Sequence, residues 1–400
     1  MATTFSITIN YARIMLNFEF QNPTKIIFGK GQIARLSKEI PENAKILMAY
    51  GQGSIFKNGV YDQVKAALVG YEIIEFGGIE ANPNFSTLMK AVEIAKTEKI
   101  DFILAVGGGS VIDGVKFISA ALLFDGEPWD ILKNSIRIFK GVPFGTILTL
   151  PATGSEMNSG SVISRYETQE KFAMGGPGLF PVFSILDPAV VASIPARQLR
   201  NGLIDAYTHV MEQYLTYPIG AELQDRIAES ILKTLISIAP KIMADPTNLT
   251  LAGELMWCCT MALNGLIQKG VPTDWATHAI GHELTALHKL DHAVTLAIIL
   301  PSLYKTKFEQ KKEKLARYAA EVWGIKEGTI ETKAEKGIEK TISFFESLEI
   351  KTKLSDHVAS GFEETATIIE KRFTDRKWMG LGEHKDITPA VVRQIVEAAY

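Results

Sequence analysis

One stretch of the chain, from Asp205 to His292, holds five of its seven histidines. Asp205 and His209 are four residues apart, so on a helix they lie on the same face. A carboxylate and imidazoles from separate segments are ligands that suit a catalytic divalent metal, and three or four of them leave a position open for a substrate. We therefore predict a metal centre in this stretch. The further candidate ligands are His278, His282, His288 and His292.

The spacing alone leaves the choice of ligands open. Asp205, His209, His278 and His282 form an acceptable set, because His278 and His282 also share a helix face. Along a continuous helix His278 and His292 would be roughly 21 Å apart. They can meet only if the chain turns back between them, and the segment HKLD at 288–291 offers such a break. The segment HELTA is not a zinc-protease motif, because Ala286 stands in place of the second histidine.

Two glycine-rich turns follow apolar segments typical of strands. Glycine lets backbone N–H groups approach a phosphate, and the helix that follows adds a positive N-terminal end. Neither turn matches GxGxxG, and each alone is equally well explained as an ordinary turn. Two such turns at the carboxyl ends of strands favour a dinucleotide site. The first turn supplies Gly51, Gly53, Ser54 and Lys57, and the second supplies Gly107, Gly108, Gly109 and Ser110.

The first turn also indicates which dinucleotide binds. An NAD site usually places an acidic residue here to accept hydrogen bonds from the ribose hydroxyls, but from Gly51 onward no Asp or Glu occurs until Asp62. Small donors and Lys57 suit a 2'-phosphate, so we predict NADP(H), although Lys57 could also be an ordinary solvated helix residue. The segment LTLPATGSEMNSG adds Thr149, Thr153 and Asn158, which could bind cofactor or cap the next element.

The elements that must position these residues change character along the chain. From Lys25 to Pro188, short apolar runs such as KILMAYG and DFILAVGGG alternate with amphipathic stretches, which predicts a doubly wound parallel sheet. VISRY and KFAMGG predict a β-hairpin, and FSILDP one more strand. From about Pro195 onward the patterns are helical. We expect an N-terminal extension at 1–14, an α/β domain with a Rossmann-like sheet at 15–195, and an all-α domain at 196–400, with a cleft between the two domains.

Composition narrows the classes of protein. The chain has 400 residues, which favours two domains, and is 46% hydrophobic and 22% charged, as ordinary globular proteins are. A net charge of -3 without a long basic run argues against binding to nucleic acid or to a membrane surface. The two cysteines, Cys258 and Cys259, lie in an apolar run and read as core residues of a cytoplasmic protein. No apolar stretch reaches the roughly eighteen residues of a spanning helix.

Four motifs together resemble those of the iron-containing, group III alcohol dehydrogenases: GGGSVID, LTLPATGSE, NGLIDAYTHVMEQY and THAIGHELTALHKLDHAVTLAIILP. The resemblance runs from about Met15 to the C-terminus. It is strongest to the NADPH-dependent butanol dehydrogenase and broad-range aldehyde reductase branch, and it implies an architecture like that of dehydroquinate synthase. Two departures from the wider family fit this branch: the threonine-rich stretch is short, and the first turn lacks an aspartate.

The resemblance also implies roles for individual residues. It assigns the metal to Asp205, His209, His278 and His292, and leaves His282 near the site as a possible proton relay. It places the 2'-phosphate on the Gly51–Ser54 turn and the pyrophosphate on Gly107 to Ser110. The further cofactor contacts that it implies are Asp113, Thr149, Thr153, Asn158 and Lys171.

We therefore expect an NADP(H)-dependent alcohol dehydrogenase or aldehyde reductase of small substrates such as butanal and butanol, present as a cytoplasmic homodimer. A bound Fe²⁺ or Zn²⁺ would polarise the carbonyl while hydride passes from the nicotinamide. One alternative is a lyase of the dehydroquinate synthase type, which the apolar and aromatic segment GVPTDWATHAIG argues against. Another is a nucleotide-binding protein that holds metal adventitiously.

Overall fold

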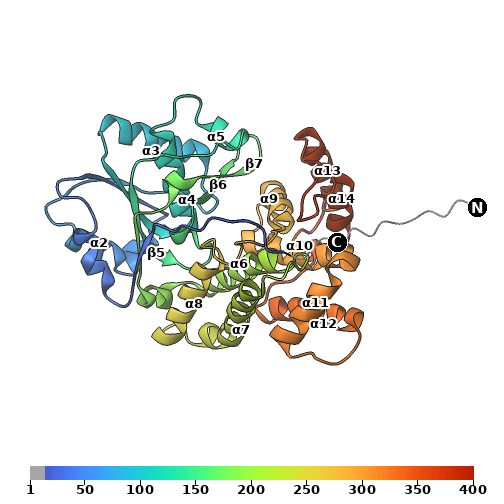
Figure 1. The fold of residues 1–400 in the computed structure, drawn as a ribbon. Helices are drawn as coiled ribbons and strands as arrows, with labels where there is room; N and C mark the ends of the chain where they lie inside the picture. The colour runs from blue at the N-terminus through green and yellow to red at the C-terminus, as the bar shows by residue number, and fades with distance from the viewer. Residues whose placement is uncertain (1–13) are drawn as a thin grey trace, which may run out of the picture.

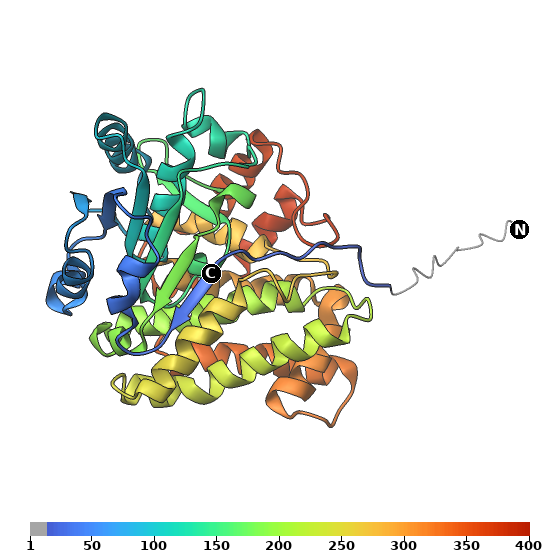
Figure 2. The same ribbon diagram turned by 60° about the vertical axis from the view of Figure 1, so that its left-hand side comes forward.

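The structure is a computed structural model and describes residues 14–400. The expected N-terminal extension therefore lies outside the described residues, apart from Ile14. The α/β part of the chain and the helical part lie side by side, as Figure 1 shows, and the sheet is seen from another side in Figure 2.

The central element is a parallel sheet of six strands in the order β1-β8-β5-β4-β2-β3. β6 and β7 form a separate antiparallel hairpin in which Ile163 pairs with Phe172. All eight strands coincide with the segments that the sequence predicts. Their bounds are β1 Lys25–Phe28, β2 Lys45–Tyr50, β3 Glu72–Phe76, β4 Phe102–Gly108, β5 Phe144–Leu150, β6 Gly160–Arg165, β7 Glu170–Gly175 and β8 Phe183–Leu186.

The inner strands are apolar on both faces because both faces are covered. In β4, the residues from Phe102 to Gly107 are buried, as expected for a parallel sheet between layers of helices. The amphipathic stretch that begins at Ser54 forms two short helices, because Gly59 adopts a left-handed conformation (φ 75°) between them. The helices of this part are α1 Ser54–Lys57, α2 Val60–Ala67, α3 Phe85–Thr97, α4 Gly109–Ala121 and α5 Trp129–Lys133.

Between Ile194 and Tyr400 the structure has helices and no strand, apart from an isolated bridge between Leu381 and Ile387. The predicted domain boundary at 195/196 stays a prediction. The helices are α6 Ala196–Tyr214, α7 Glu222–Ala244, α8 Leu249–Ala262, α9 Ala276–His288, α10 His292–Thr306, α11 Phe308–Trp323, α12 Ile330–Ser347, α13 Thr365–Asp375 and α14 Pro389–Glu397.

The sequence predicts that the two cysteines lie in the core and that no segment is apolar over the length of a membrane-spanning helix. Cys258 and Cys259 are free and buried on α8, as predicted for core residues. Across residues 14–400, no helix combines the length and the apolar character that a membrane crossing requires.

Candidate metal and cofactor site

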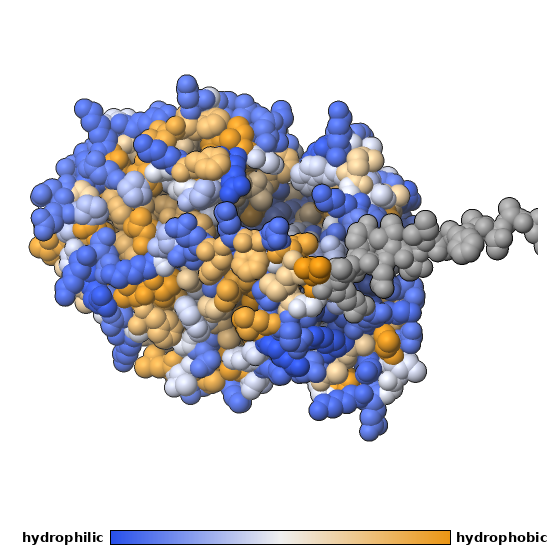
Figure 3. Space-filling view, in the orientation of Figure 1, coloured by the Kyte–Doolittle hydropathy of each residue, from blue (hydrophilic) through white to orange (hydrophobic). Residues whose placement is uncertain are grey.

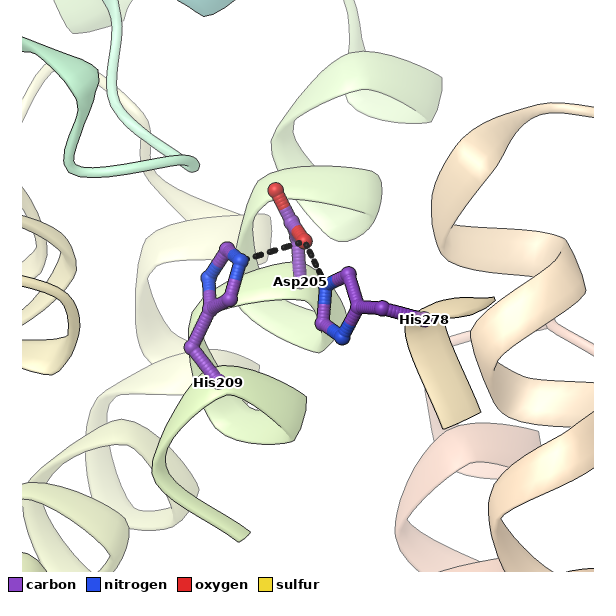
Figure 4. Close-up of side chains that lie close together, drawn as sticks. All are labelled: Asp205, His209 and His278. Carbon is purple, nitrogen blue, oxygen red and sulfur yellow. Dashed lines mark ion pairs between the residues drawn. The ribbon is translucent and has the colours of Figure 1, made fainter. Parts of the chain in front are cut away.

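Four candidate ligands come together around one carboxylate oxygen. Asp205 and His209 lie one turn apart on α6, and His278 approaches them from α9 (Figure 4). The Asp205 Oδ1 atom is 3.6 Å from His209 Nε2 and 3.7 Å from His278 Nε2. His292 is the first residue of α10, and its Nε2 atom is also 3.7 Å from Asp205 Oδ1. The break that the sequence predicts between α9 and α10 brings His278 and His292 together.

The chemistry of these residues fits a divalent metal. Ligand atoms of Asp205, His209 and His278 all lie within 4.8 Å of one another. Asp205 Oδ1 and His278 Nε2 are buried and find no hydrogen-bond partner within residues 14–400, which is costly unless another group binds them. One carboxylate oxygen and three imidazole nitrogens from Asp205, His209, His278 and His292 could hold Zn²⁺ or Fe²⁺.

The other two histidines of the stretch lie elsewhere. His288 bonds to Thr365 Oγ1 at 2.8 Å, away from the cluster. The His282 ring is 6.2 Å from the His278 ring and 5.3 Å from the His292 ring, but His282 is not among the residues that line the central cavity. Burial lowers the pKa of His282 well below its usual value, and the charge of Lys171 lowers it further.

Glu212 is a site residue that we did not predict from the sequence. It lies on α6, contacts the Nδ1 atom of His278, and accepts a hydrogen bond from the backbone N–H of Thr277 at 2.7 Å. This contact fixes the His278 ring with its Nε2 atom toward Asp205, which is the usual arrangement of a carboxylate behind a metal-binding histidine. Its spacing offered a signal, because Asp205, His209 and Glu212 follow one another at four and three residues on one helix face.

Three loops meet at the carboxyl edge of the sheet because β5, β4 and β2 are neighbours. Most of the predicted cofactor residues lie in these loops, at the strand ends before them or in α1 and α4, whereas Lys171 lies on β7. Several glycines are required by close contacts: a Cβ atom at Gly107 would lie 2.5 Å from Val111, and one at Gly109 would lie 2.3 Å from Thr153 Oγ1. The second turn leads directly into the N-terminus of α4. Backbone N–H groups at this helix end could donate hydrogen bonds to a phosphate.

The first turn differs in exposure from the second. Gly53 has a left-handed conformation (φ 100°) immediately before α1, and Ser54 and Lys57 are exposed. Gly109, Ser110, Asp113, Thr153, Asn158 and Lys171 line the central cavity, whereas Gly51, Gly53, Ser54, Lys57, Gly107, Gly108 and Thr149 do not.

A buried lysine holds the third loop in place, and it too was missing from our predictions. Lys116 on α4 donates to Ser155 Oγ at 2.8 Å, to Asn158 Oδ1 at 2.9 Å and to the Gly160 carbonyl at 2.7 Å. Burial lowers the pKa of Lys116 to about 8. Asp113 accepts a further hydrogen bond from Ser155 Oγ at 2.6 Å. The predicted cofactor residues Asp113 and Asn158 therefore belong to one polar network.

Lys171, on the β6–β7 hairpin, connects the two sides of the site. Its ammonium group donates to Asn82 Oδ1 at 2.8 Å, and burial lowers its pKa to about 8. The negative charges of Asp205 and Asp113 both act on Lys171. Lys171 therefore lines the same cavity as Asp205 and Asp113.

The cavity that these residues line has a volume of about 1470 Å³ and receives side chains from both halves of the chain. Figure 3 shows the surface hollowed between the two halves. The volume exceeds that of a pocket for one small ligand, so the cavity can accept an extended cofactor and a small substrate together.

Two family models and several curated proteins match this chain. Residues 23–188 match the family model described as iron-containing alcohol dehydrogenase, and residues 201–400 match that of the C-terminal part of the Fe-containing alcohol dehydrogenase family. The chain is 49% identical to the NADPH-dependent aldehyde reductase YqhD of Escherichia coli over 96% of its length and all of that protein. It is 40% identical to a probable NADH-dependent butanol dehydrogenase of Bacillus subtilis, with coverage of 96% and 100%.

Solved structures similar to this chain also include an E. coli YqhD and a butanol dehydrogenase. The crystal structure of E. coli YqhD matches with a TM-score of 0.95 and 48% identity over 97% of this chain and 100% of that one. The NADH-dependent butanol dehydrogenase A of Thermotoga maritima matches with a TM-score of 0.91 and 35% identity, with coverage of 96% and 99%.

Proposed function

The chain belongs to the iron-containing alcohol dehydrogenase family, and we propose that it is an NADP(H)-linked alcohol dehydrogenase that works as a reductase of small aldehydes. The observation that carries this proposal is the cluster of Asp205 with three imidazoles in a cavity that also receives the sheet's carboxyl edge. The relatives named for aldehyde reduction and butanol oxidation support the same chemistry.

We assign the metal to Asp205, His209, His278 and His292. A divalent ion held there supplies a Lewis acid for the carbonyl oxygen of the substrate. Glu212 holds the His278 ring in place through its Nδ1 atom. The expected iron and zinc both suit this donor set.

We assign NADP(H) to the carboxyl edge of the sheet. Gly107 to Ser110 would bind the pyrophosphate through backbone N–H groups at the start of α4, and NADPH supplies the hydride. Asp113, Thr149, Thr153, Asn158 and Lys171 would position the rest of the cofactor. Gly51, Gly53, Ser54 and Lys57 would bind the 2'-phosphate, for which small donors and a lysine are suited in a turn that carries no Asp or Glu of its own.

We propose His282 as the residue that passes a proton toward the site, because its ring lies 5.3 Å from that of His292. For the whole protein we propose a homodimer, since Phe18, Phe20 and Phe28 expose about half of their surface. We propose the cytoplasm as its compartment, where the free cysteines would stay reduced.

The test compares butanal reduction with NADPH and with NADH, together with the metal content of the purified protein. We expect NADPH to be preferred, and we expect His278→Ala to lose both bound metal and reductase activity while NADPH binding remains measurable. His288→Ala is the matched control on the same helix, because His288 bonds to Thr365 away from the cluster. Full activity of metal-free His278→Ala would refute the metal assignment, and a clear preference for NADH would refute the cofactor assignment.

A further inference from the structure

We infer that Trp275 forms the wall of the pocket that receives the aldehyde, and that it selects unbranched aliphatic aldehydes over those branched next to the carbonyl carbon. This inference rests on the proposed function, because it names the substrate class of the same site. Trp275 precedes α9, two residues before Thr277 and three before the predicted metal ligand His278.

The indole of Trp275 lies beside the predicted metal ligands. Its ring is 5.7 Å from the His278 ring in an edge-to-face arrangement, and 6.3 Å from the His209 ring. Trp275 is half-buried and lines the central cavity together with these histidines. A carbonyl group bound next to Asp205 and the imidazoles would therefore place its first carbon atoms against the indole.

The backbone of Trp275 is in the left-handed region, with φ 61° and ψ 6°. Glycine and asparagine adopt this conformation readily, whereas a bulky aromatic residue does so at a cost in free energy. Such strain at a residue that lines a cavity next to candidate ligands indicates a functional requirement rather than a chance turn.

The residues around Trp275 hold this conformation in place. Asp274 is buried: its backbone N–H donates to the Glu212 carbonyl at 2.9 Å, and its Oδ1 atom accepts from the Ala276 N–H at 3.0 Å. The other carboxylate oxygen pairs with buried Lys311 at 2.9 Å, and Lys311 also pairs with Glu383 at 2.8 Å. The backbone of Trp275 is therefore held from both sides, which keeps its indole beside the rings of His209 and His278.

The flat, rigid indole ring would select between aldehydes by the width of the carbon chain next to the carbonyl group. A linear alkyl chain can lie along the indole face, whereas a methyl branch next to the carbonyl would collide with the indole ring. One misplaced methyl or methylene group typically changes kcat/KM by roughly 10-fold to 200-fold. Among the described cavity-lining residues, Leu263 and Ala152 add apolar surface suited to such a chain.

The experiment measures kcat/KM for butanal and for 2-methylpropanal, which contain the same atoms but differ in branching. We expect the native protein to prefer butanal. Trp275→Ala should lower the ratio of kcat/KM for butanal to kcat/KM for 2-methylpropanal by at least about tenfold. Trp275→Phe should lower this ratio by less. The matched control is Trp257→Ala, since Trp257 is a 41% exposed tryptophan on α8 outside the central cavity, and it should leave the ratio unchanged.

A second measurement is independent of turnover. Calorimetry on the metal-loaded protein with NADPH, which cannot react with an alcohol, should show the same change in preference between 1-butanol and 2-methyl-1-propanol. If Trp275→Ala keeps the native preference for the linear over the branched compound in either measurement, the inference is overturned. Loss of metal in both Trp275 variants would also overturn it, because Trp275 would then only support the ligands. If the native protein reduces neither aldehyde, the proposed function fails, and the alcohol affinities still decide the role of Trp275.

Discussion

At the scale of single residues, Glu212 shows that a side chain can be essential to a site without facing it. It contacts the nitrogen of His278 that points away from Asp205, and it also accepts hydrogen bonds from the backbone N–H groups at the start of α9. Glu212 therefore fixes both the ring and the helix that carries it. Such carboxylates orient the metal-binding face of an imidazole.

Glu212→Gln should weaken metal binding by about 10-fold to 100-fold, because the amide cannot hold the His278 ring as a carboxylate does. Competition with a chromophoric chelator measures this affinity directly. Glu229→Gln is the control, since Glu229 is equally buried but pairs with Arg317 away from the site. Equal metal affinities in Glu212→Gln and the native protein would show that Glu212 has no orienting role.

Lys116→Met should weaken NADPH binding by about tenfold or more, because each hydrogen bond of the buried ammonium group contributes about 1.5–3 kcal/mol to the arrangement of the loop. Fluorescence titration with NADPH measures the affinity, and metal content should stay unchanged. The control is Lys314→Met, since Lys314 is a buried lysine that pairs with Asp225 in the helical part. A folded Lys116→Met protein with native NADPH affinity would contradict this prediction.

Whether a site residue could be predicted depends on how far away in the sequence its partners lie. Asp205 with His209 could be predicted because both lie on one helix face, and Glu212 could have been found in the same way. His292 could not be distinguished from His282 by spacing, and only the family resemblance favoured it. Lys116 and Trp275 carry no local signal, because their roles depend on contacts with residues far away in the sequence.

At the scale of elements, the break between α9 and α10 determines where His292 lies. Lys289 ends α9 in a left-handed conformation (φ 56°), and Asp291 precedes α10. Arg197 and Asn201 of α6 hold the Asp291 carboxylate at 2.7 Å and 2.9 Å, and the hydrogen bond from Arg197 lowers the pKa of Asp291. α6 therefore positions the start of α10 as well as carrying Asp205.

Lys289→Val should lower the free energy of unfolding by about 1–3 kcal/mol, because a β-branched residue is strongly disfavoured at positive φ. It should also weaken metal binding, whereas Lys289→Gly should preserve both properties. Urea unfolding and chelator competition measure the two effects. The control is Lys99→Val, because Lys99 has the same backbone conformation (φ 52°) after α3 but lies far from the ligands. A Lys289→Val protein that binds metal like the native protein would show that the break does not position His292.

Most elements could be predicted from the sequence because their signals are local. The apolar runs of β2, β4 and β5 require burial on both faces. Glycine ends β2 and β4, and Pro151 ends β5. The two-helix arrangement of α1 and α2 was missed because Gly59 interrupts an otherwise continuous amphipathic pattern. The strand order was not predicted, and this order is what places the three cofactor loops side by side.

At the scale of the whole molecule, α13 connects the two halves beside the cavity. Glu283 on α9 is buried and pairs with Arg372 at 2.9 Å and with Arg376. Arg372 also donates to the Gln169 carbonyl at 3.1 Å, at the turn of the β6–β7 hairpin that carries Lys171. This arginine therefore links the helix of His278 to the hairpin that closes the cofactor side.

Arg372→Ala should loosen the hairpin, because the bonds to Gln169 are lost and Glu283 keeps only Arg376. We expect faster amide hydrogen exchange across residues 160–175 and NADPH affinity several-fold lower. Metal content should stay native, because Arg376 still pairs with Glu283 on α9, the helix that carries His278. The control is Arg393→Ala, since Arg393 pairs only with Glu397 and Glu370 among the described residues. If Arg372→Ala exchanges as slowly as the native protein in this segment, the hairpin is held by its own packing, and α13 has no part in keeping the two halves together.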